Sequence, residues 1–272
     1  MHTQLDDNAI SRYQQDGFLH VPGFLKQGEV AELKQAVLAT VESMGRRKIA
    51  DSELTEESGD SYYDRVFTQR LNLWRISPVV KSYMLRAELG ELLCRLADVG
   101  GMRVWHDQAL IKPPFGNPTA WHLDNPYWSF SSRDSISIWI ALEPATLGNG
   151  CMWFVPGSQR LARFDNVGIG ENVGDLFRLY PEMANTDPVA VPMQAGDCSF
   201  HNGLTAHGAG ANMTRQRRLA MTCAYMPDGS VFNGQSNILP PSYLKTLSKG
   251  DTLRNDDWNP LIHPLPKGPD SR

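Results

Sequence analysis

His122 and Asp124 are separated by one residue, and both side chains are common metal ligands. Residues i and i+2 of a β-strand point to the same face, so a strand here would present both groups to one point. A later histidine would complete a set of two histidines and one carboxylate, which non-haem Fe(II) oxygenases use to hold one face of the iron octahedron. The pair alone is weak, because a chain with seven histidines and many aspartates would contain this spacing about half the time by chance.

A second segment, residues 196–227, offers the third ligand and a cation. We expect it to form a strand, a turn rich in Gly and Asn, and a second strand that ends before Pro227. His207 would close one arm of this hairpin, and Arg218 would lie near it on the other arm. A guanidinium binds a carboxylate through two parallel hydrogen bonds, which is what a 2-oxo acid with a second carboxylate needs.

Several motifs in one order make this interpretation specific. The chain resembles the phytanoyl-CoA dioxygenase family, a branch of the Fe(II)/2-oxoglutarate oxygenases, over most of its length. The motifs that resemble the family are Asp16-Gly17-Phe18, Lys112-Pro113-Pro114, His122-Leu123-Asp124, Asn149-Gly150-Cys151-Met152 running into Val155-Pro156-Gly157-Ser158, and the segment from His207 to Arg218. Motifs that occur together in register are much stronger than any one of them.

The resemblance implies a cofactor set and its residues. Fe(II) would be held by His122, Asp124 and His207, with 2-oxoglutarate and O2 as cosubstrates. The 2-oxoglutarate would chelate the iron through its keto and carboxylate oxygens, while Arg218 would bind its distal carboxylate.

The resemblance also indicates Gln108 and Trp139, by position, as walls of the cosubstrate pocket; without it, both would be interpreted as residues that fill a barrel. Ala209 departs from the family, which often has a hydroxyl residue there. Loss of one hydrogen bond would weaken 2-oxoglutarate binding by about 1 kcal/mol.

Other residues compete for these roles. His201 is an alternative third ligand, but it directly precedes an Asn-Gly turn and lies farther from Arg218, so we prefer His207. Arg215 and Arg217 are expected to be solvated, although a register slip by one residue would exchange either of them with Arg218.

The remaining histidines and the cysteines have plainer interpretations. His106 is expected to be a core histidine or one that supports the ligands. Surface positions are expected for His2, His20 and His263. No CxxC spacing occurs, so we expect buried, small apolar roles for Cys94, Cys151, Cys198 and Cys223.

Composition excludes several classes. At 272 residues and 41% hydrophobic content, the chain can bury a large core. A net charge of −4 without a long basic run argues against nucleic acid, and no segment is apolar enough to suggest a membrane span. The ends carry no recognisable targeting signal, so we expect a cytosolic enzyme with a small-molecule substrate. Nothing in the sequence indicates an oligomeric state.

The pattern of elements predicts helices first and strands later. We expect a mostly β fold with flanking α-helices, whose core is a double-stranded β-helix, or jelly roll. Residues 1–272 would form one domain, with a helical part over about 1–100, the jelly roll over about 101–228 and a tail over 229–272. The expected early elements are a helix at Asp6 to Gln15, a strand at Phe18 to Val21, a helix at Gln27 to Met44, a loop at Arg46 to Ser61 and a helix at Pro78 to Asp98.

Two segments are expected to interrupt the jelly roll, and a tail follows it. Residues 168–187 form an insertion long enough to act as a lid. In residues 125–133, Tyr127, Trp128 and Phe130 would either contact substrate or pack the rim of the barrel. The tail would wrap the surface or join a partner.

These features favour hydroxylation of an aliphatic C–H of a small or medium polar metabolite, with release of succinate and CO2. Related halogenases replace the carboxylate ligand by a small residue, so Asp124 argues against halogenation, while desaturation and ring closure stay open. The family name suggests an acyl-CoA substrate, but no basic cluster near the motifs would bind the CoA phosphates. A cupin that uses Zn or Mn without 2-oxoglutarate, and a non-catalytic binding protein, are further alternatives.

Overall fold

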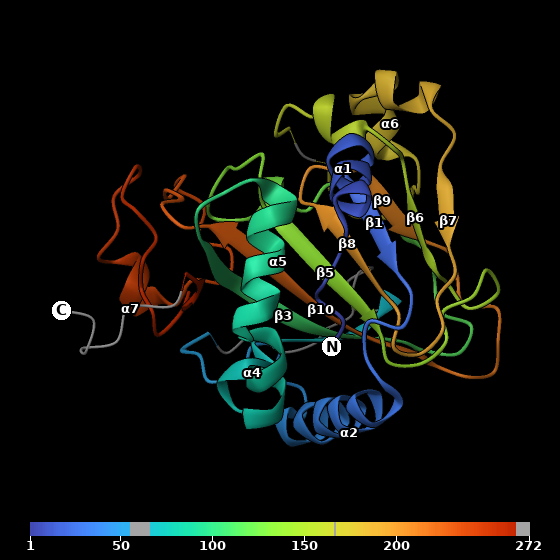
Figure 1. The fold of residues 1–272 in the computed structure, drawn as a ribbon, viewed down its shortest axis with the longest axis horizontal. Helices are drawn as coiled ribbons and strands as arrows, with labels where there is room; N and C mark the ends of the chain where they lie inside the picture. The colour runs from blue at the N-terminus through green and yellow to red at the C-terminus, as the bar shows by residue number, and fades with distance from the viewer. Residues whose placement is uncertain (55–65, 166, 265–272) are drawn as a thin grey trace.

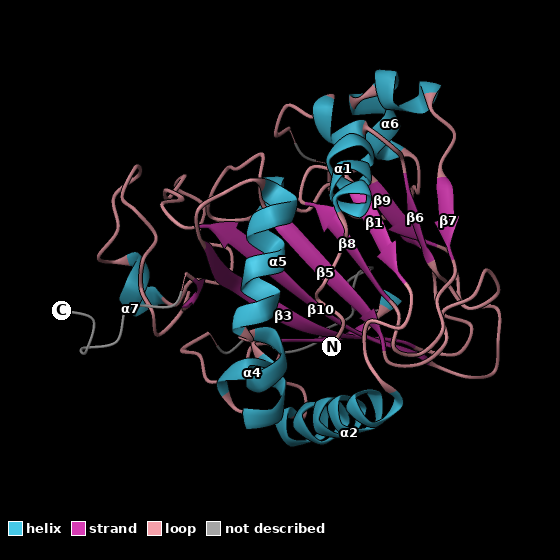
Figure 2. Cartoon of the chain, viewed as in Figure 1, coloured by secondary structure: helices cyan, strands magenta, loops and turns pink. Residues whose placement is uncertain are grey.

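Two antiparallel sheets form the core of the protein. The computed structural model describes residues 1–54, 66–165 and 167–264, and within them helices cover the outer face of the larger sheet (Figure 1). This arrangement confirms the predicted fold, a double-stranded β-helix with flanking helices. Figure 2 shows the strands of both sheets enclosed by helices and long loops.

The larger sheet has the order β1-β8-β5-β10-β3-β11, and β2 also pairs with β3. Its strands are β1 Phe18–Val21, β2 Thr68–Leu71, β3 Met102–Lys112, β5 Ile136–Ala141, β8 Cys198–Asn202, β10 Arg218–Pro227 and β11 Leu261–His263. The smaller sheet has the order β4-β9-β6-β7. Its strands are β4 Thr119–His122, β6 Met152–Phe154, β7 Val189–Val191 and β9 His207–Ala209.

Alternation along the strands decides which side chains enter the site. On β10, Leu219 and Met221 pack in the core beneath the helices, whereas Ala220 packs between the two sheets. Arg218 and Thr222 share the face of Ala220, because side chains two residues apart point the same way. The inner face of this strand therefore presents a cation and a hydroxyl to the interior of the jelly roll.

Local capping explains the first helices. Asp6 precedes α1, Asp7–Asp16, and its side chain accepts a hydrogen bond from the backbone N–H of Ala9. Gly17 ends this helix with φ of 78°, a conformation that favours glycine. The next helix, α2, spans Gln27–Met44, as its apolar spacing predicts.

The single helix predicted over residues 78–98 is wrong, because it divides into two. They are α4, Pro78–Met84, and α5, Ala87–Ala97. Arg86 between them has extended backbone (φ −69°, ψ 131°). Helix α5 packs so closely on β11 that a Cβ on Gly90 would lie 2.8 Å from the Cβ of His263. Helix α4 instead packs on α2, so α4 and α5 pack against different elements.

The insertion and the tail are both packed against the core. Residues 168–187 include α6, Asp175–Leu179, and η4, Pro181–Asn185, and their buried Leu176, Tyr180 and Met183 form a cluster with Leu123. The described part of the tail adds α7, Pro241–Leu244, and pairs β11 with β3, so it wraps the surface as one alternative predicted. Short 3-10 helices are η1 Leu73–Arg75, η2 Asn125–Tyr127 and η3 Ser158–Arg160.

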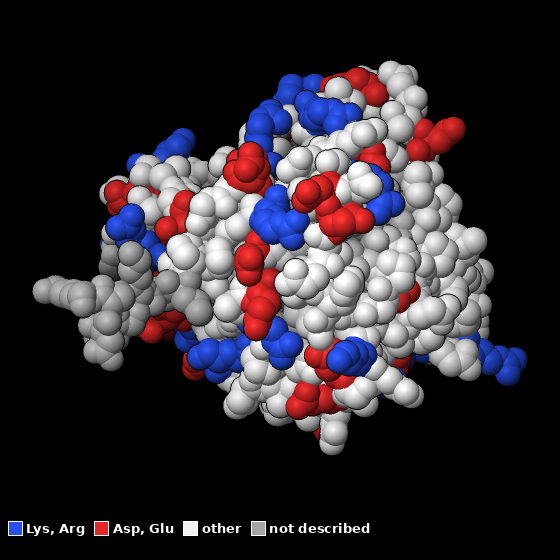
Figure 3. Space-filling model, viewed as in Figure 1, with Lys and Arg blue, Asp and Glu red and all other residues white. Residues whose placement is uncertain are grey.

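Other predictions have mixed outcomes. The loop predicted over residues 46–61 has no helix or strand as far as residue 54, and its remainder lies outside the described residues. All four cysteines are buried and unpaired. No helix among the described residues is long and apolar enough to cross a membrane. On the face drawn in Figure 3, basic and acidic side chains are interspersed.

Candidate functional site

His122 and His207 are brought together by strand pairing. His122 ends β4, His207 begins β9, and the two residues are direct partners in the antiparallel pair. Nδ1 of His122 is 2.8 Å from the carbonyl oxygen of Ala120, and Nδ1 of His207 is 2.9 Å from that of Thr205. Because a carbonyl only accepts, both Nδ1 atoms carry the proton, and Nε2 of each ring is left for a metal.

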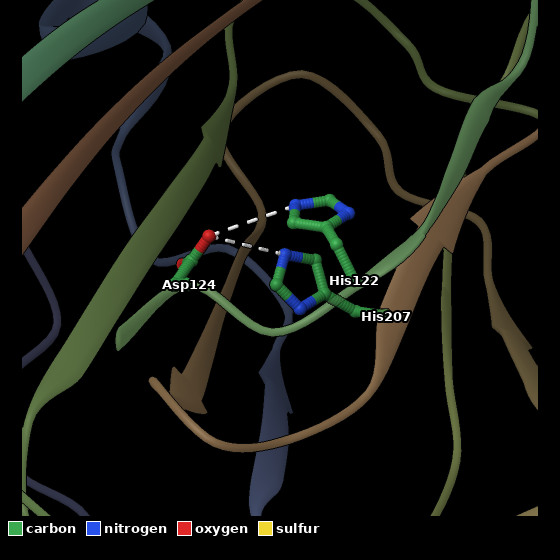
Figure 4. Close-up of side chains that lie close together, drawn as sticks. All are labelled: His122, Asp124 and His207. Atoms are coloured by element: carbon green, nitrogen blue, oxygen red, sulfur yellow. Dashed lines mark ion pairs between the residues drawn. The ribbon is translucent and has the colours of Figure 1, made fainter. Parts of the chain in front are cut away.

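Asp124 completes the group from outside the strand. Its Oδ1 lies 3.6 Å from Nε2 of His122 and 3.6 Å from Nε2 of His207 (Figure 4). The three ligand atoms all lie within 4.8 Å of one another. The expectation that one strand presents both His122 and Asp124 is wrong, because β4 ends at His122 and Asp124 has helical backbone at the start of η2. The bend turns Asp124 back toward the histidines.

The electrostatics of the group suit a cation. Burial would raise the pKa of Asp124, but the neighbouring His207, His122 and His201 hold this pKa well below its usual range. Burial, reinforced by His122, keeps the pKa of His207 well below the usual range for histidine. Two histidines with free Nε2 atoms and an ionised carboxylate are the donor set that fits a divalent transition metal.

His201 lies beside this group without completing it. Its Nε2 is 3.3 Å from Oδ2 of Asp124, whereas the contacts of His122 and His207 are with Oδ1. Ser137 donates a hydrogen bond of 2.9 Å to the same oxygen. His201 is therefore a neighbour of the carboxylate, and the three-residue group of potential ligands contains His207.

Arg218 lies in an inner cavity that reaches the same group. Its side chain is 1% exposed, and all three guanidinium nitrogens lack hydrogen-bond partners among the described residues. The guanidinium carbon lies 5.0 Å from the ring centre of Trp139. Burial lowers the pKa of Arg218 to about 10, which leaves the guanidinium charged at neutral pH. A buried, charged and unpaired guanidinium is costly unless an anion joins it.

The hairpin predicted for residues 196–227 is wrong in its pairing. Strand β9, with His207, belongs to the smaller sheet, whereas β10, with Arg218, pairs with β3 and β5 in the larger one. Both residues nevertheless line the inner cavity, because the two sheets face each other across it. Arg215 and Arg217 are exposed as expected, and Arg217 pairs with Glu143.

Gln108 and Trp139 both line the inner cavity, and their role as walls of a cosubstrate pocket stays a prediction. On the larger sheet Thr222 of β10 pairs with Gln108 on one side and with Trp139 on the other. All three line the inner cavity, and Ala209 lines it from the facing sheet. Thr119, the direct partner of Ala209, also lines the cavity. The hydroxyls of Thr119 and Thr222 are thus available where the sequence lacks one at Ala209.

An outer cavity adjoins the inner one. Gln108, His122 and Asp124 line both cavities. His106, two residues before Gln108 on β3, lines the outer cavity only, and burial lowers its pKa to about 4. The outer cavity is also lined by Lys48, Ile49, Gln69, Leu71, Tyr127, Trp128, Ile169, Asn237 and Ile238.

Some residues of the site were not predicted from the sequence. They are Phe67, Leu110, Thr119, Met152 and Thr222 in the inner cavity, Ser137 beside Asp124, and Lys112 next to Arg218. Strand alternation could have placed both Ser137 and Thr222 on the inner face, since Ser137 lies two residues from Trp139 and Thr222 lies four residues from Arg218. Phe67 and Met152 give no local signal. Of the histidines expected at the surface, His2 is exposed, while His20 and His263 are half-buried.

Fold, donor set and unpaired guanidinium together define an Fe(II)- and 2-oxoglutarate-dependent dioxygenase. The family model described as Phytanoyl-CoA dioxygenase (PhyH) matches residues 13–220, and the chain belongs to that family.

Three similar proteins illustrate the range of the family. A methylphosphonate hydroxylase from Gimesia maris is 26% identical over 235 residues, which are 83% of this chain and 82% of that protein. The α-ketoglutarate-dependent carbocyclase SnoK of nogalamycin biosynthesis is 28% identical with a TM-score of 0.74, covering 95% of this chain and 96% of SnoK. The epimerase SnoN, solved with Fe3+, α-ketoglutarate and nogalamycin RO, is 28% identical with a TM-score of 0.73, covering 94% of this chain and 98% of SnoN.

Replacement of His207 by alanine should abolish tight Fe(II) binding. A ligand lost from a three-residue set should raise the Fe(II) dissociation constant by more than about 100-fold, beyond the effect of changing a supporting residue. Anaerobic titration of the metal-free protein measures this constant. His2→Ala, which changes an exposed histidine, is the matched control and should bind as wild type does; equal binding by His207→Ala would exclude it as a ligand.

Replacement of Arg218 by methionine should weaken 2-oxoglutarate binding and leave Fe(II) binding intact. Two charge-assisted hydrogen bonds are worth about 1.5–3 kcal/mol each, so the 2-oxoglutarate dissociation constant should rise at least about tenfold. The visible charge-transfer band of the anaerobic Fe(II) complex reports this binding. The metal-free variant should be no less stable than wild type, because an unpaired buried charge is removed.

The matched control for this experiment is Arg217→Met, which removes an exposed guanidinium next to Arg218 in the sequence. It should leave the band and the 2-oxoglutarate affinity unchanged. A similar loss of 2-oxoglutarate affinity in both variants would mean that positive charge in this region, and not direct binding by Arg218, causes the effect.

The affinity for 2-oxoglutarate should fall as pH rises above about 7. Lys112 is buried beside Arg218, and burial, followed by the charge of Arg218, lowers its pKa to about 7. A bound dianion would favour the protonated lysine and raise this pKa, so affinity is greatest below pH 7 and declines between the free and bound pKa values.

Titrations of the charge-transfer band between pH 6 and 9 measure this dependence. Lys112→Met should flatten it, with Fe(II) affinity determined at each pH as the reference. A wild-type affinity that is constant with pH would contradict the role of Lys112.

Proposed function

We propose that the protein hydroxylates an aliphatic C–H of a small or medium polar metabolite, with release of succinate and CO2. His122, Asp124 and His207 would hold Fe(II), and Arg218 would bind the distal carboxylate of 2-oxoglutarate. The observation that supports this most directly is the inner cavity, which is lined by both the potential metal ligands and an unpaired guanidinium. A 2-oxo diacid needs both, a metal for its 2-oxo acid group and a cation for its second carboxylate.

The inner face of the larger sheet would orient the cosubstrate. Arg218 would fix one carboxylate, Thr222 and Gln108 would offer hydrogen bonds along the chain of the acid, and Trp139 would supply an apolar wall. When bound, the iron would activate O2, the oxidant, with two electrons from 2-oxoglutarate, which is the chemistry needed to break an unactivated C–H bond. The protein positions the acid and, with a cavity walled by both sheets, limits access of water.

The outer cavity would bind the substrate. It has a volume of about 400 Å³, within the range of small-molecule sites, and it reaches His122 and Asp124. Aliphatic side chains and Trp128 form part of its wall, and Gln69, His106 and Asn237 supply polar groups. The low pKa of His106 keeps this imidazole neutral at neutral pH. Such a lining suits a molecule with both an apolar skeleton and a few hydrogen-bonding groups.

The same lining argues against a CoA thioester. Lys48 is the one lysine or arginine among the described residues of the outer cavity, whereas CoA carries several phosphate charges. Hydroxylation is preferred to halogenation because Asp124 retains the carboxylate. We also propose that residues 1–272 act as one oxygenase domain in the cytosol, where reducing conditions would preserve Fe(II) and the four thiols.

A substrate panel tests this proposal. The holoenzyme, loaded with Fe(II), would be incubated with polar metabolites bearing aliphatic chains or rings, and with CoA thioesters, while 2-oxoglutarate consumption is measured. We expect consumption coupled to a product that has gained one oxygen atom, for members of the first group. Turnover restricted to CoA thioesters would contradict the substrate class, and a product that has only lost two hydrogens would replace hydroxylation by desaturation or ring closure.

A further inference from the structure

Asp124 presents its two carboxylate oxygens to different partners. Oδ1 lies 3.6 Å from Nε2 of both His122 and His207. Oδ2 accepts a hydrogen bond of 2.9 Å from Oγ of Ser137 and lies 3.3 Å from Nε2 of His201. One oxygen therefore faces the point between the ligand histidines, while the other is occupied by hydrogen-bond donors.

The two donors come from one rigid surface. Ser137 on β5 and His201 on β8 are direct cross-strand partners, so their side chains project next to each other from the inner face of the larger sheet. Both residues are 2% exposed. Asp124, in contrast, lies in the bend after β4. The pair thus ties a ligand on a loop to the strands of the opposite sheet.

The imidazole of His201 has no other polar role among the described residues. Its Nδ1 is buried and has no hydrogen-bond partner in residues 1–54, 66–165 and 167–264, so within them the contact with Asp124 is the one hydrogen bond of this ring. The rings of His207, 4.5 Å away between centres, and Phe154, 5.4 Å away, confine it. Because the buried ring of His201 makes a single hydrogen bond, to the carboxylate of Asp124, we infer that the role of His201 is to hold this carboxylate.

The number of oxygens that Asp124 contributes matters for the reaction. A carboxylate binds a metal through one oxygen or two. Three protein ligands and a 2-oxo acid bound through two atoms use five of six octahedral positions, and the sixth is needed for O2. A second oxygen from Asp124 would fill that position. Hydrogen bonds that occupy Oδ2 oppose this.

We propose that Ser137 and His201 are positioning residues that keep Asp124 a one-oxygen ligand and thereby keep one coordination position open. The inference rests on the Fe(II)/2-oxoglutarate chemistry of the site and does not depend on the substrate. This role also explains why His201 lies close to the group of His122, Asp124 and His207 without belonging to it.

Nitric oxide tests the open position without turnover. The donor-free variant is Ser137→Ala with His201→Leu, and the matched control is Ser137→Thr with His201→Gln, which retains a hydroxyl and an N–H donor. Each protein would be loaded anaerobically with Fe(II) and 2-oxoglutarate, followed by the charge-transfer band, and then titrated with nitric oxide. The S = 3/2 electron paramagnetic resonance signal of the iron–nitrosyl complex measures nitric oxide affinity.

The donor-free variant should retain Fe(II) and the charge-transfer band but bind nitric oxide about 10- to 100-fold more weakly, as expected for loss of residues that orient a ligand. The control variant should restore affinity to near the wild-type value. Unchanged nitric oxide affinity in the donor-free variant would overturn the proposal, as would a loss that the control shares, since packing would then be its cause.

Ser137→Ala alone, which removes one oxygen atom, provides the same comparison if the leucine variant does not fold. It should show a smaller loss in the same direction, and Ser137→Thr should not show it. A wild-type protein that binds Fe(II) but gives no charge-transfer band would count against the proposed function, whereas a normal band with unaltered nitric oxide affinity in Ser137→Ala would count against this inference alone.

Discussion

The site depends on the register of one short strand pair, in which His122 of β4 lies opposite His207 of β9. Side chains alternate along a strand, so a slip of one residue would turn one imidazole away from the other. The pairing contains an irregularity between Thr119 and His122, and both histidines fix their Nδ1 atoms on nearby carbonyls. The backbone thus determines where each Nε2 atom lies before any metal arrives, and Asp124 needs only to turn back toward that point.

Buried charge is the second constraint, and it explains why the interior of the jelly roll is not apolar. Arg218 is removed from water, and the side chain of Asp124 is only 22% exposed, at a cost that a hydrophobic core would avoid. Asp124 is compensated within the protein by hydrogen bonds from Ser137 and His201 to its Oδ2. Arg218 is not compensated by any hydrogen bond among the described residues. The two charges therefore differ in the ligand they can bind. Asp124 can bind a cation through Oδ1 and keep its hydrogen bonds, whereas Arg218 can bind an anion that provides the partner it lacks.

Much of this arrangement could be predicted from the sequence because local rules decide it. Helix α2 and strand β1 follow directly from apolar spacing and from Pro and Gly positions, and the family's motifs identify His122, Asp124 and His207. Pairing could not be predicted in the same way. Residues 196–227 have the pattern of one hairpin, yet β9 and β10 join different sheets. Strand alternation places Ser137 on the inner face, but nothing in its neighbours along the chain indicates its contact with Asp124, which only the packing of the sheets creates.

The two cavities are lined by different parts of the chain. The residues that would hold iron and 2-oxoglutarate are therefore largely separate from those that would select the substrate. Apart from Phe67 and Asp124, the residues lining the inner cavity lie in strands, so changing them disturbs sheet pairing as well as the site. The outer cavity is lined instead by several residues between the strands, among them Lys48, Tyr127, Trp128, Ile169, Asn237 and Ile238. Loop residues tolerate change better than paired strands. A fold of this kind can keep one iron centre while its substrate changes, which accounts for a hydroxylase, a carbocyclase and an epimerase among its relatives.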